Sequence, residues 1–257
     1  MSSNSKRRLN VLILAGGYGT RLYPLTLNLP KPLLKIGQRT VIDFSLDRLK
    51  GLDYLEEIFV VTNNKFYRNF VQWKKKVKFT NKITVVNDGT KNNNERLGSI
   101  GDLYFTIKKE KIDSDILVIA GDNIFKMGLA SFMDFANQKL PNISIGVYDV
   151  KKKAMATRYG VVKLDKDNRI VDFLEKPEDP PSSMVATCVY FFPKETIPLL
   201  YEYVERFKSK TDAAGNYIQW LLKKTKVYAF TFRGPWLDIG QIDTYKKAER
   251  EFSKISN

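Results

Sequence analysis

The first candidate site for binding a phosphate group is a glycine-rich segment that follows the first apolar run. Residues 11–15 are apolar, glycines stand at positions 16, 17 and 19, and Arg21 comes shortly after them. Glycines let backbone N–H groups approach an anion closely, because no side chain blocks the path. The spacing is not a Walker motif, since no Gly-Lys pair follows, nor the dinucleotide fingerprint, since Leu22 replaces its third glycine. By itself the turn fits a structural role as well as a functional one, and Arg21 favours phosphate binding.

Four charged side chains further along the chain stand at places where a binding group is expected. Prolines on both sides of Lys31 restrict the backbone, which suits a lysine that must keep a fixed position. Asp122 follows the apolar run 116–120, and open α/β sheets bind ligands at such strand ends. Plainer interpretations remain open: a Pro-rich loop at Lys31 and a Gly-Asp-Asn turn at Asp122. Glu175 and Lys176 likewise fit a surface pair at the end of a strand.

The absence of histidine limits the chemistry of any site. The 257 residues include no His and a single cysteine, Cys188. A serine–histidine triad, a Cys/His zinc site and an intramolecular disulfide are therefore excluded. A metal ion would need oxygen ligands, which favours magnesium.

Charge and hydropathy favour small phosphorylated substrates over nucleic acid or membrane. The net charge is +15, but the lysine clusters are scattered and no nucleic-acid-binding signature accompanies them. Such a positive field attracts phosphorylated substrates. No segment resembles a signal peptide or approaches the roughly 18 apolar residues of a membrane span. We therefore expect a cytoplasmic protein that binds neither nucleic acid nor membrane.

The elements that must position these side chains alternate between apolar strands and helices. Strands are expected at 9–15, 58–62, 83–86, 116–120, 143–147, 185–192 and 227–232, a hairpin at 160–174, and helices at 41–52, 66–73, 100–109, 196–207, 216–222 and from residue 243. Continuous apolar strands separated by helices predict an α/β fold, with a mixed, mainly parallel sheet covered by helices on both faces. We expect residues 1–8 to form a flexible tail and residues 9–257 a single domain.

These motifs resemble the signature of the sugar-1-phosphate nucleotidyltransferases, most of all that of glucose-1-phosphate thymidylyltransferases. The resemblance rests on Leu14-Ala15-Gly16-Gly17-Tyr18-Gly19-Thr20-Arg21-Leu22, Pro30-Lys31-Pro32-Leu33-Leu34, Gly121-Asp122-Asn123, Tyr159-Gly160-Val161-Val162, Glu175-Lys176-Pro177 and Trp236-Leu237-Asp238-Ile239-Gly240, in the family's order. It implies a Rossmann-like catalytic domain with a nucleotide-binding half at about 9–125 and a sugar-binding half at about 126–240. The implied reaction joins a nucleoside triphosphate, with dTTP or UTP favoured, to a sugar 1-phosphate, with glucose 1-phosphate favoured. The products are a nucleotide sugar and pyrophosphate.

The resemblance also implies roles for individual residues. The catalytic residues would be Arg21, Lys31, Asp122 and Asp238, of which Asp122 and Asp238 would bind Mg²⁺. The nucleotide-binding residues would be Leu14, Gly16, Gly17, Gly19, Thr20, Arg21, Asn87 and Gly98. The residues that bind the sugar phosphate would be Asn123, Gly160, Glu175 and Lys176.

Four departures from the family pattern concern the base, the sugar and a regulatory site. Asn87 stands where thymidylyltransferases tend to carry a glutamine that contacts the base, and Cys188 stands where a glycine is usual beside the sugar. The segment Ala213-Ala214-Gly215-Asn216-Tyr217 lacks the arginine and glutamate that flank the glycine in some bacterial members. The segment after Asp238 is short, so the helices of a remote regulatory site are expected to be absent.

Two other functions stay open beside the favoured one. The same scaffold could serve a cytidylyltransferase that acts on a non-sugar phosphate such as choline phosphate. It could also form a catalytically silent regulatory subunit that binds nucleotide sugars, although such a subunit would be expected to lose the charged residues. The sequence also leaves the oligomeric state open, a homo-oligomer included.

Overall fold

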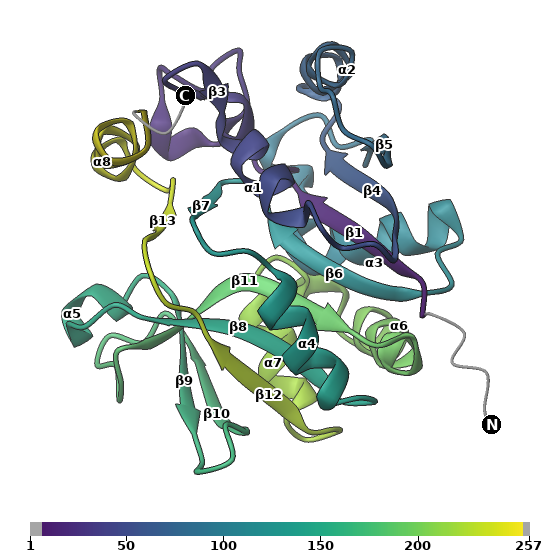
Figure 1. Cartoon of the computed structure of the whole chain (residues 1–257), viewed down its shortest axis with the longest axis vertical. Coiled ribbons are helices and arrows are strands. Elements are labelled where there is room, and N and C mark those ends of the chain that lie inside the picture. The colour runs from purple at the N-terminus through teal and green to yellow at the C-terminus, as the bar shows by residue number, and fades with distance from the viewer. Residues whose placement is uncertain (1–6, 254–257) are drawn as a thin grey trace.

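Nine strands of the described chain form one mixed sheet at the centre of the molecule (Figure 1). The computed structural model describes residues 7–253, apart from the side chain of Ser209. The strands are β1 Leu9–Leu14, β4 Leu55–Thr62, β5 Lys82–Asn87, β6 Asp115–Ala120, β8 Ile143–Asp149, β9 Gly160–Leu164, β10 Ile170–Glu175, β11 Met184–Phe192 and β12 Val227–Thr231. Their order is β10-β9-β11-β6-β1-β4-β5, and β8 pairs with β11 and β12 beside this path.

The pairing of the strands brings the candidate binding residues to one edge of the sheet. β1 lies between β4 and β6 and is parallel to both, with Leu14 opposite Ala120. β11 runs antiparallel to β6, β8 and β9. Because the carboxyl ends of parallel strands meet at the same edge, the glycine-rich segment after β1 and Asp122 after β6 lie near each other.

Helices cover both faces of the sheet. Alternate side chains of a strand point to opposite faces, and Val11 and Leu12 accordingly belong to two different core clusters. The first face is covered by α1 Val41–Leu49, α2 Tyr67–Lys74 and α4 Ala130–Gln138, and the second by α3 Gly98–Glu110, α6 Ile197–Arg206 and α7 Ala214–Leu221. Figure 1 shows α4 in front of the sheet and α7 behind it. The predicted α/β fold, Rossmann-like and mixed, is confirmed.

A third apolar cluster holds the segment that carries Asp238. Its elements are the hairpin β2 Lys35–Ile36 and β3 Arg39–Thr40, the antiparallel pair β7 Asn123–Phe125 and β13 Trp236–Asp238, and α8 Ile242–Phe252. Phe252 of α8 packs edge-on against Phe44 of α1, with ring centroids 5.9 Å apart. This contact packs α8, near the end of the described chain, against α1 in its first part.

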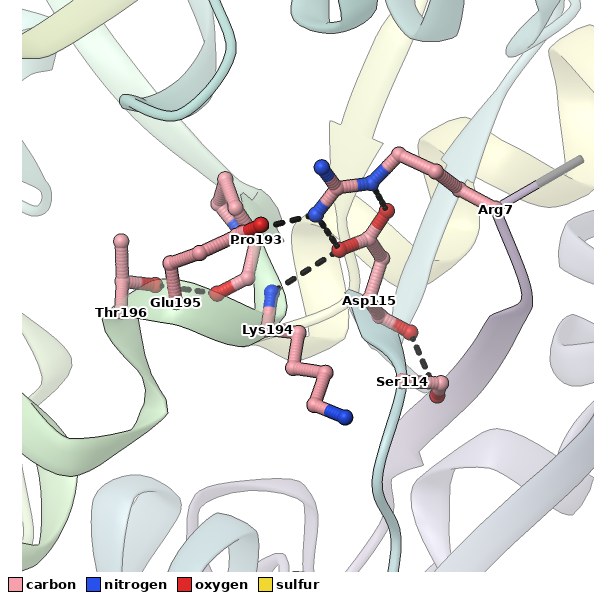
Figure 2. A network of polar contacts seen from close by, with 7 residues as sticks. All are labelled: Arg7, Ser114, Asp115, Pro193, Lys194, Glu195 and Thr196. Atoms are coloured by element: carbon pink, nitrogen blue, oxygen red, sulfur yellow. Dashed lines mark hydrogen bonds and ion pairs between the residues drawn. The ribbon is translucent and has the colours of Figure 1, made fainter. Parts of the chain in front are cut away.

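At the opposite edge of the sheet, a polar network joins the starts of two strands to the end of a third (Figure 2). Arg7 donates from Nε and Nη2 to both carboxylate oxygens of Asp115, at 2.6 and 2.7 Å, and from Nη2 to Glu195 at 2.7 Å. The backbone N–H of Lys194 donates to the same Asp115 carboxylate at 2.8 Å. Residues 1–6 of the predicted tail lie outside the described residues, whereas Arg7 is bound to the folded domain.

The structure differs from the sequence-based expectations in a few elements. The helix predicted at 41–52 ends at Leu49, because Gly51 adopts a φ of +88° that terminates it. Helix α4, the one-turn helix α5 Lys153–Ala156, and strands β7 and β13 were not predicted. None of the helices in residues 7–253 combines the length and hydropathy needed to cross a bilayer.

Candidate active site

A cavity of about 510 Å³ opens at the edge where β1 and β6 end. Eight residues that the resemblance assigns line it: Leu14, Arg21, Asp122, Asn123, Gly160, Glu175, Lys176 and Asp238. The others, Gly16, Gly17, Gly19, Thr20, Lys31, Asn87 and Gly98, do not line it. The structure therefore brings most of the expected acidic and sugar-side groups together, and their roles stay predictions.

Asp122 and Asp238 come together because β7 and β13 pair. Asp238 lies opposite Asn123 in this antiparallel pair, and the Ile239 N–H donates to the Asp122 carbonyl oxygen at 2.9 Å. Burial, helped by the negative charge of Asp122, raises the pKa of Asp238 to about 7, against the opposing effect of nearby cations such as Lys31 and Arg21. The two carboxylates thus form a site where an added cation would be stabilised.

The donor set of this pair fits a hard divalent cation. Among residues 7–253, no group of three or more His, Cys, Asp or Glu side chains is arranged to hold a metal ion. Two carboxylates supply only part of an octahedral shell, which leaves positions for phosphate oxygens and water. That arrangement suits Mg²⁺ bound together with a substrate, and Asp122 and Asp238 are the residues that would hold it.

Two basic residues come from short 3₁₀ turns beside the glycine-rich segment. Arg21 lies in Thr20–Leu22, and Lys31 lies in Lys31–Leu33, whose backbone is restricted by the flanking prolines. Lys31 Nζ is 3.4 Å from Asp122 Oδ2, so this cation reaches the acidic pair although it does not line the cavity. Gly19 has a φ of +68°, and a Cβ there would lie 3.2 Å from Lys31 Cγ. The segment therefore packs tightly around the lysine.

A second pair of carboxyls, Asp88 and Asp102, lies beside Gly16. A Cβ on Gly16 would be 2.3 Å from Asp102 Oδ2, so only glycine fits there. Burial, together with the neighbouring charge of Asp88, raises the pKa of Asp102 well above its usual range. Asp102 Oδ1 is buried and has no hydrogen-bond partner among the described residues. The sequence patterns did not indicate this pair, although Asp88 directly follows Asn87.

The residues predicted to contact the base have other contacts in this structure. Asn87 Nδ2 donates to Asn64 Oδ1 at 3.0 Å. Gly98 has a φ of +78°, and a Cβ there would lie 2.1 Å from Asp212 Cα, so the glycine permits a close backbone approach. Leu97 occupies the N-cap position of α3, and Ser99 Oγ donates to the Asp212 carbonyl at 3.0 Å.

The predicted hairpin holds the sugar-side residues. Gly160 of β9 lies opposite Glu175 of β10, and Lys176 Nζ is 3.5 Å from Glu175 Oε1. A Cβ on Gly215 would lie 2.0 Å from Glu175 Oε2, so the start of α7 packs directly on this carboxylate. Asn123 is buried, and its amide donates to the Thr187 carbonyl at 2.6 Å. Its side chain therefore ties β7 to β11 as well as lining the cavity.

Cys188 adopts the backbone conformation that favours glycine. Its φ is +58°, and it lies where the pairing of β11 with β8 is interrupted between Ala186 and Tyr190. Burial raises the pKa of its thiol to about 12, so the thiol is protonated at neutral pH. Tyr190 donates to Cys188 Sγ at 3.5 Å. The side chain acts as a part of the cavity wall and not as a nucleophile.

Further cavity residues were absent from the site predicted by sequence. Arg158 lines the cavity and donates from Nη1 to Gln241 Oε1 at 3.1 Å. Gln241 and Thr244 of the α8 start also line it. Arg158 directly precedes the Tyr159-Gly160 motif, which is the signal that could have indicated it. Fold and cavity together define an α/β protein with a charged site suited to phosphorylated ligands.

The family assignment follows from two sequence comparisons. Residues 10–254 match the model of the nucleotidyl transferase family. A glucose-1-phosphate adenylyltransferase of Fusobacterium nucleatum is 30% identical over 269 residues, covering 98% of this chain and 68% of the relative. The chain therefore belongs to the nucleotidyl transferase family, and the predicted membership of the sugar-1-phosphate nucleotidyltransferases is confirmed.

Two solved structures share the fold. A structure from Bacillus anthracis, described as a glucose-1-phosphate thymidylyltransferase in complex with sucrose, has a TM-score of 0.78 at 23% identity and covers 97% of each chain. A UDP-glucose pyrophosphorylase complexed with UDP-glucose has a TM-score of 0.80 at 19% identity, covering 96% of this chain and 99% of that one. These similarities bear on the fold, which extends over almost the whole chain.

Proposed function

We propose that this enzyme joins glucose 1-phosphate to dTTP or UTP in a magnesium-dependent reaction that releases pyrophosphate. The observation that carries the proposal is that one cavity is lined both by the acidic pair Asp122 and Asp238 and by the cations Arg21 and Lys176. The names of the similar proteins differ in the nucleotide, which is adenylyl, thymidylyl or uridylyl, but share glucose. That shared element supports glucose 1-phosphate more strongly than it supports any one base.

The reaction would be an in-line attack of a sugar phosphate oxygen on the α-phosphorus of the triphosphate. A new P–O bond forms there, and the bond to the bridging oxygen breaks, so that pyrophosphate leaves. A phosphate monoester has its second pKa near about 6, so the attacking oxygen is already ionised at neutral pH. No general base is required, which agrees with a chain that has no histidine.

The main barrier is then the repulsion between two polyanions. Arg21 and Lys31 come from the nucleotide side, and Lys176 comes from the sugar side. Preorganised cations of this kind stabilise the charge that develops on the transferring group. A Mg²⁺ ion on Asp122 and Asp238 would add Lewis-acid stabilisation of the phosphoryl oxygens.

A pyrophosphate-release screen tests the proposal. Each of ATP, GTP, CTP, UTP and dTTP is combined with glucose 1-phosphate, other hexose 1-phosphates and choline phosphate, with magnesium or with EDTA. We expect turnover with glucose 1-phosphate and dTTP or UTP, and only with magnesium. Turnover with CTP and choline phosphate would favour the cytidylyltransferase, and binding of nucleotide sugars without turnover would favour the silent subunit. An Asp238→Asn enzyme reports any contaminating activity.

A further inference from the structure

We infer that Arg158 binds the phosphate group of the sugar 1-phosphate together with Lys176, and that Gln241 positions the Arg158 guanidinium. The inference rests on the proposed function, which it extends to a residue outside the family motifs. It makes Arg158 a catalytic residue in the strict sense, because it would touch the substrate. Gln241 would act through Arg158.

The first observation is the place of Arg158 in the chain. It lies between α5 and β9, two elements that Figure 1 labels. It lines the cavity that Asp122, Lys176 and Asp238 also line. The backbone N–H of Lys176 donates to the Tyr159 carbonyl at 3.1 Å. The chain segments that carry Arg158 and Lys176 are therefore bonded directly to each other. A ligand that Lys176 binds would lie on the same wall.

The second observation concerns the side-chain partners of the two cations, Arg158 and Lys176. Within residues 7–253, Arg158 forms no ion pair, and its side-chain partner is the neutral Gln241 amide at 3.1 Å. Lys176, in contrast, lies 3.5 Å from the Glu175 carboxylate. A sugar phosphate carries close to two negative charges at neutral pH. Lys176 alone would leave most of that charge unmatched, whereas Arg158 offers a full charge and a planar fork that fits phosphate oxygens.

The third observation is the division of the cavity between the two substrates. The described cations that line it are Arg21, Arg158 and Lys176. Arg21 belongs to the glycine-rich segment on the nucleotide side, whereas Arg158 adjoins the hairpin of Gly160 and Glu175. The lining residues Ala213 to Gly215 carry no charge, and the charged residue beside them, Asp212, is an anion paired with Arg96. Arg158 is therefore the cation placed to complement Lys176 at the sugar phosphate and not at the triphosphate.

Gln241 is suited to hold the guanidinium. It is the N-cap residue of α8, and its backbone exchanges hydrogen bonds with the Thr244 hydroxyl at 2.8 and 3.2 Å. α8 is in turn anchored by the buried Ala248 and Phe252. An amide acceptor orients Arg158 without neutralising it, which a carboxylate at the same position would do.

The experiment compares Arg158→Gln, Arg158→Lys and Gln241→Ala in steady-state pyrophosphate release, with each substrate varied in turn. We expect Arg158→Gln to raise KM for glucose 1-phosphate by about 10- to 100-fold, or about 1.4–2.8 kcal/mol, as for a lost charged hydrogen bond. KM for the triphosphate should stay within about twofold, since Arg21 and Lys31 remain. Arg158→Lys should recover part of the loss, because it keeps the charge and loses the fork.

Gln241→Ala should raise the same KM by a smaller factor, about two- to fivefold, and should add nothing in an Arg158→Gln background, since it acts through that residue. The control is Lys153→Gln, an exposed lysine of α5 that does not line the cavity. It should change neither KM. Melting temperatures of all variants should stay close to that of the wild type.

The outcomes separate this inference from the proposed function. A rise of KM for the triphosphate alone, or no change in either KM, would overturn the assignment of Arg158 even if the enzyme is active. If the wild type turns over no substrate pair, calorimetry with glucose 1-phosphate decides: binding that Arg158→Gln weakens at least tenfold supports the site without the reaction. A wild type that binds no sugar phosphate overturns both.

Discussion

Asp238→Asn should lower activity and raise stability at the same time. The substitution keeps the shape of the side chain and removes one of the two carboxylates that would hold the metal. Metal stabilisation of a phosphoryl transition state amounts to several kcal/mol. Losing roughly 3–5 kcal/mol would slow turnover by about a hundred- to several-thousand-fold, at about 1.4 kcal/mol per decade.

The gain in stability follows from the raised pKa of Asp238, which is about 7 because of burial and of the charge on Asp122. An aspartate in the unfolded chain has a pKa near about 3.9. Between these values the folded protein holds a proton that the unfolded chain has released, so stability falls as pH rises through this window. The gap corresponds to about 4 kcal/mol at about 1.4 kcal/mol per unit, and partial solvent access reduces it to about 1–2 kcal/mol.

The Asp238→Asn side chain does not ionise, so the variant should not lose stability as the pH rises through this window. At pH 8 without metal, its melting temperature should exceed that of the wild type by about 2–8 °C, at roughly 2–4 °C per kcal/mol for a chain of this size. Near pH 4 the two proteins should melt alike. The assay is calorimetry at both pH values together with turnover over a magnesium series. Asp167→Asn, in the exposed turn after β9, is the matched control.

Two results would refute this reasoning. Near-normal turnover of Asp238→Asn would remove Asp238 from the metal site. A melting temperature well below that of the wild type would mark the carboxylate as a structural group, whose buried charge is compensated by the neighbouring cations.

Three further predictions concern other parts of the molecule. Asp102→Asn should stabilise the protein by roughly 1–3 kcal/mol at pH 8 and by less at pH 5, as measured by urea unfolding at both pH values. The pKa of Asp102 is higher in the folded protein than in the unfolded chain, so ionisation at high pH favours the unfolded chain, and asparagine does not ionise. Gly215→Ala should raise KM for the sugar phosphate by about tenfold, because the added methyl group, 2.0 Å from Glu175 Oε2, must displace that carboxylate. Steady-state kinetics with each substrate varied measures this, and an equal rise of KM for the sugar phosphate and KM for the triphosphate would contradict it. Arg7→Ala should cost about 1–3 kcal/mol in urea unfolding and leave turnover unchanged, because the nearly buried Asp115 carboxylate then keeps only the Lys194 backbone N–H as a donor; an unchanged midpoint would show that the ion pair contributes nothing.

The elements that the sequence predicts well are those whose signal is local. Apolar runs such as 116–120 and the hairpin at 160–174 carry their pattern within a few residues, and the structure has them within one or two positions. The glycine-rich segment is also local, because a positive φ at Gly19 and a close approach at Gly16 require glycine whatever the rest of the chain does. The strand edge that carries Asp122 follows from the order of the parallel strands.

Features that depend on distant pairing were beyond such patterns. β7 and β13 have three residues each, too few for periodicity, and each is a strand because the other lies beside it. Their pairing is nevertheless what brings Asp238 to Asp122. Arg158 and Gln241 meet only through the placement of α8. Asp102 looks like one more polar residue on a helix until its packing against Gly16 is known.

The electrostatics of the cavity give these separate observations a common cause. Burial, and after it the neighbouring charge of Asp122, make Asp238 costly to ionise, which its raised pKa reflects. In the same cavity, Arg158 forms no ion pair within residues 7–253, and its side-chain partner Gln241 is neutral. The buried carboxyl of Asp238 lowers the stability of the free protein when it ionises, whereas the exposed Arg158 keeps its charge in contact with solvent. A bound cation would stabilise the ionised form of Asp238, so the free energy that its burial costs the fold would be recovered on binding, and a bound phosphate would give Arg158 an anionic partner.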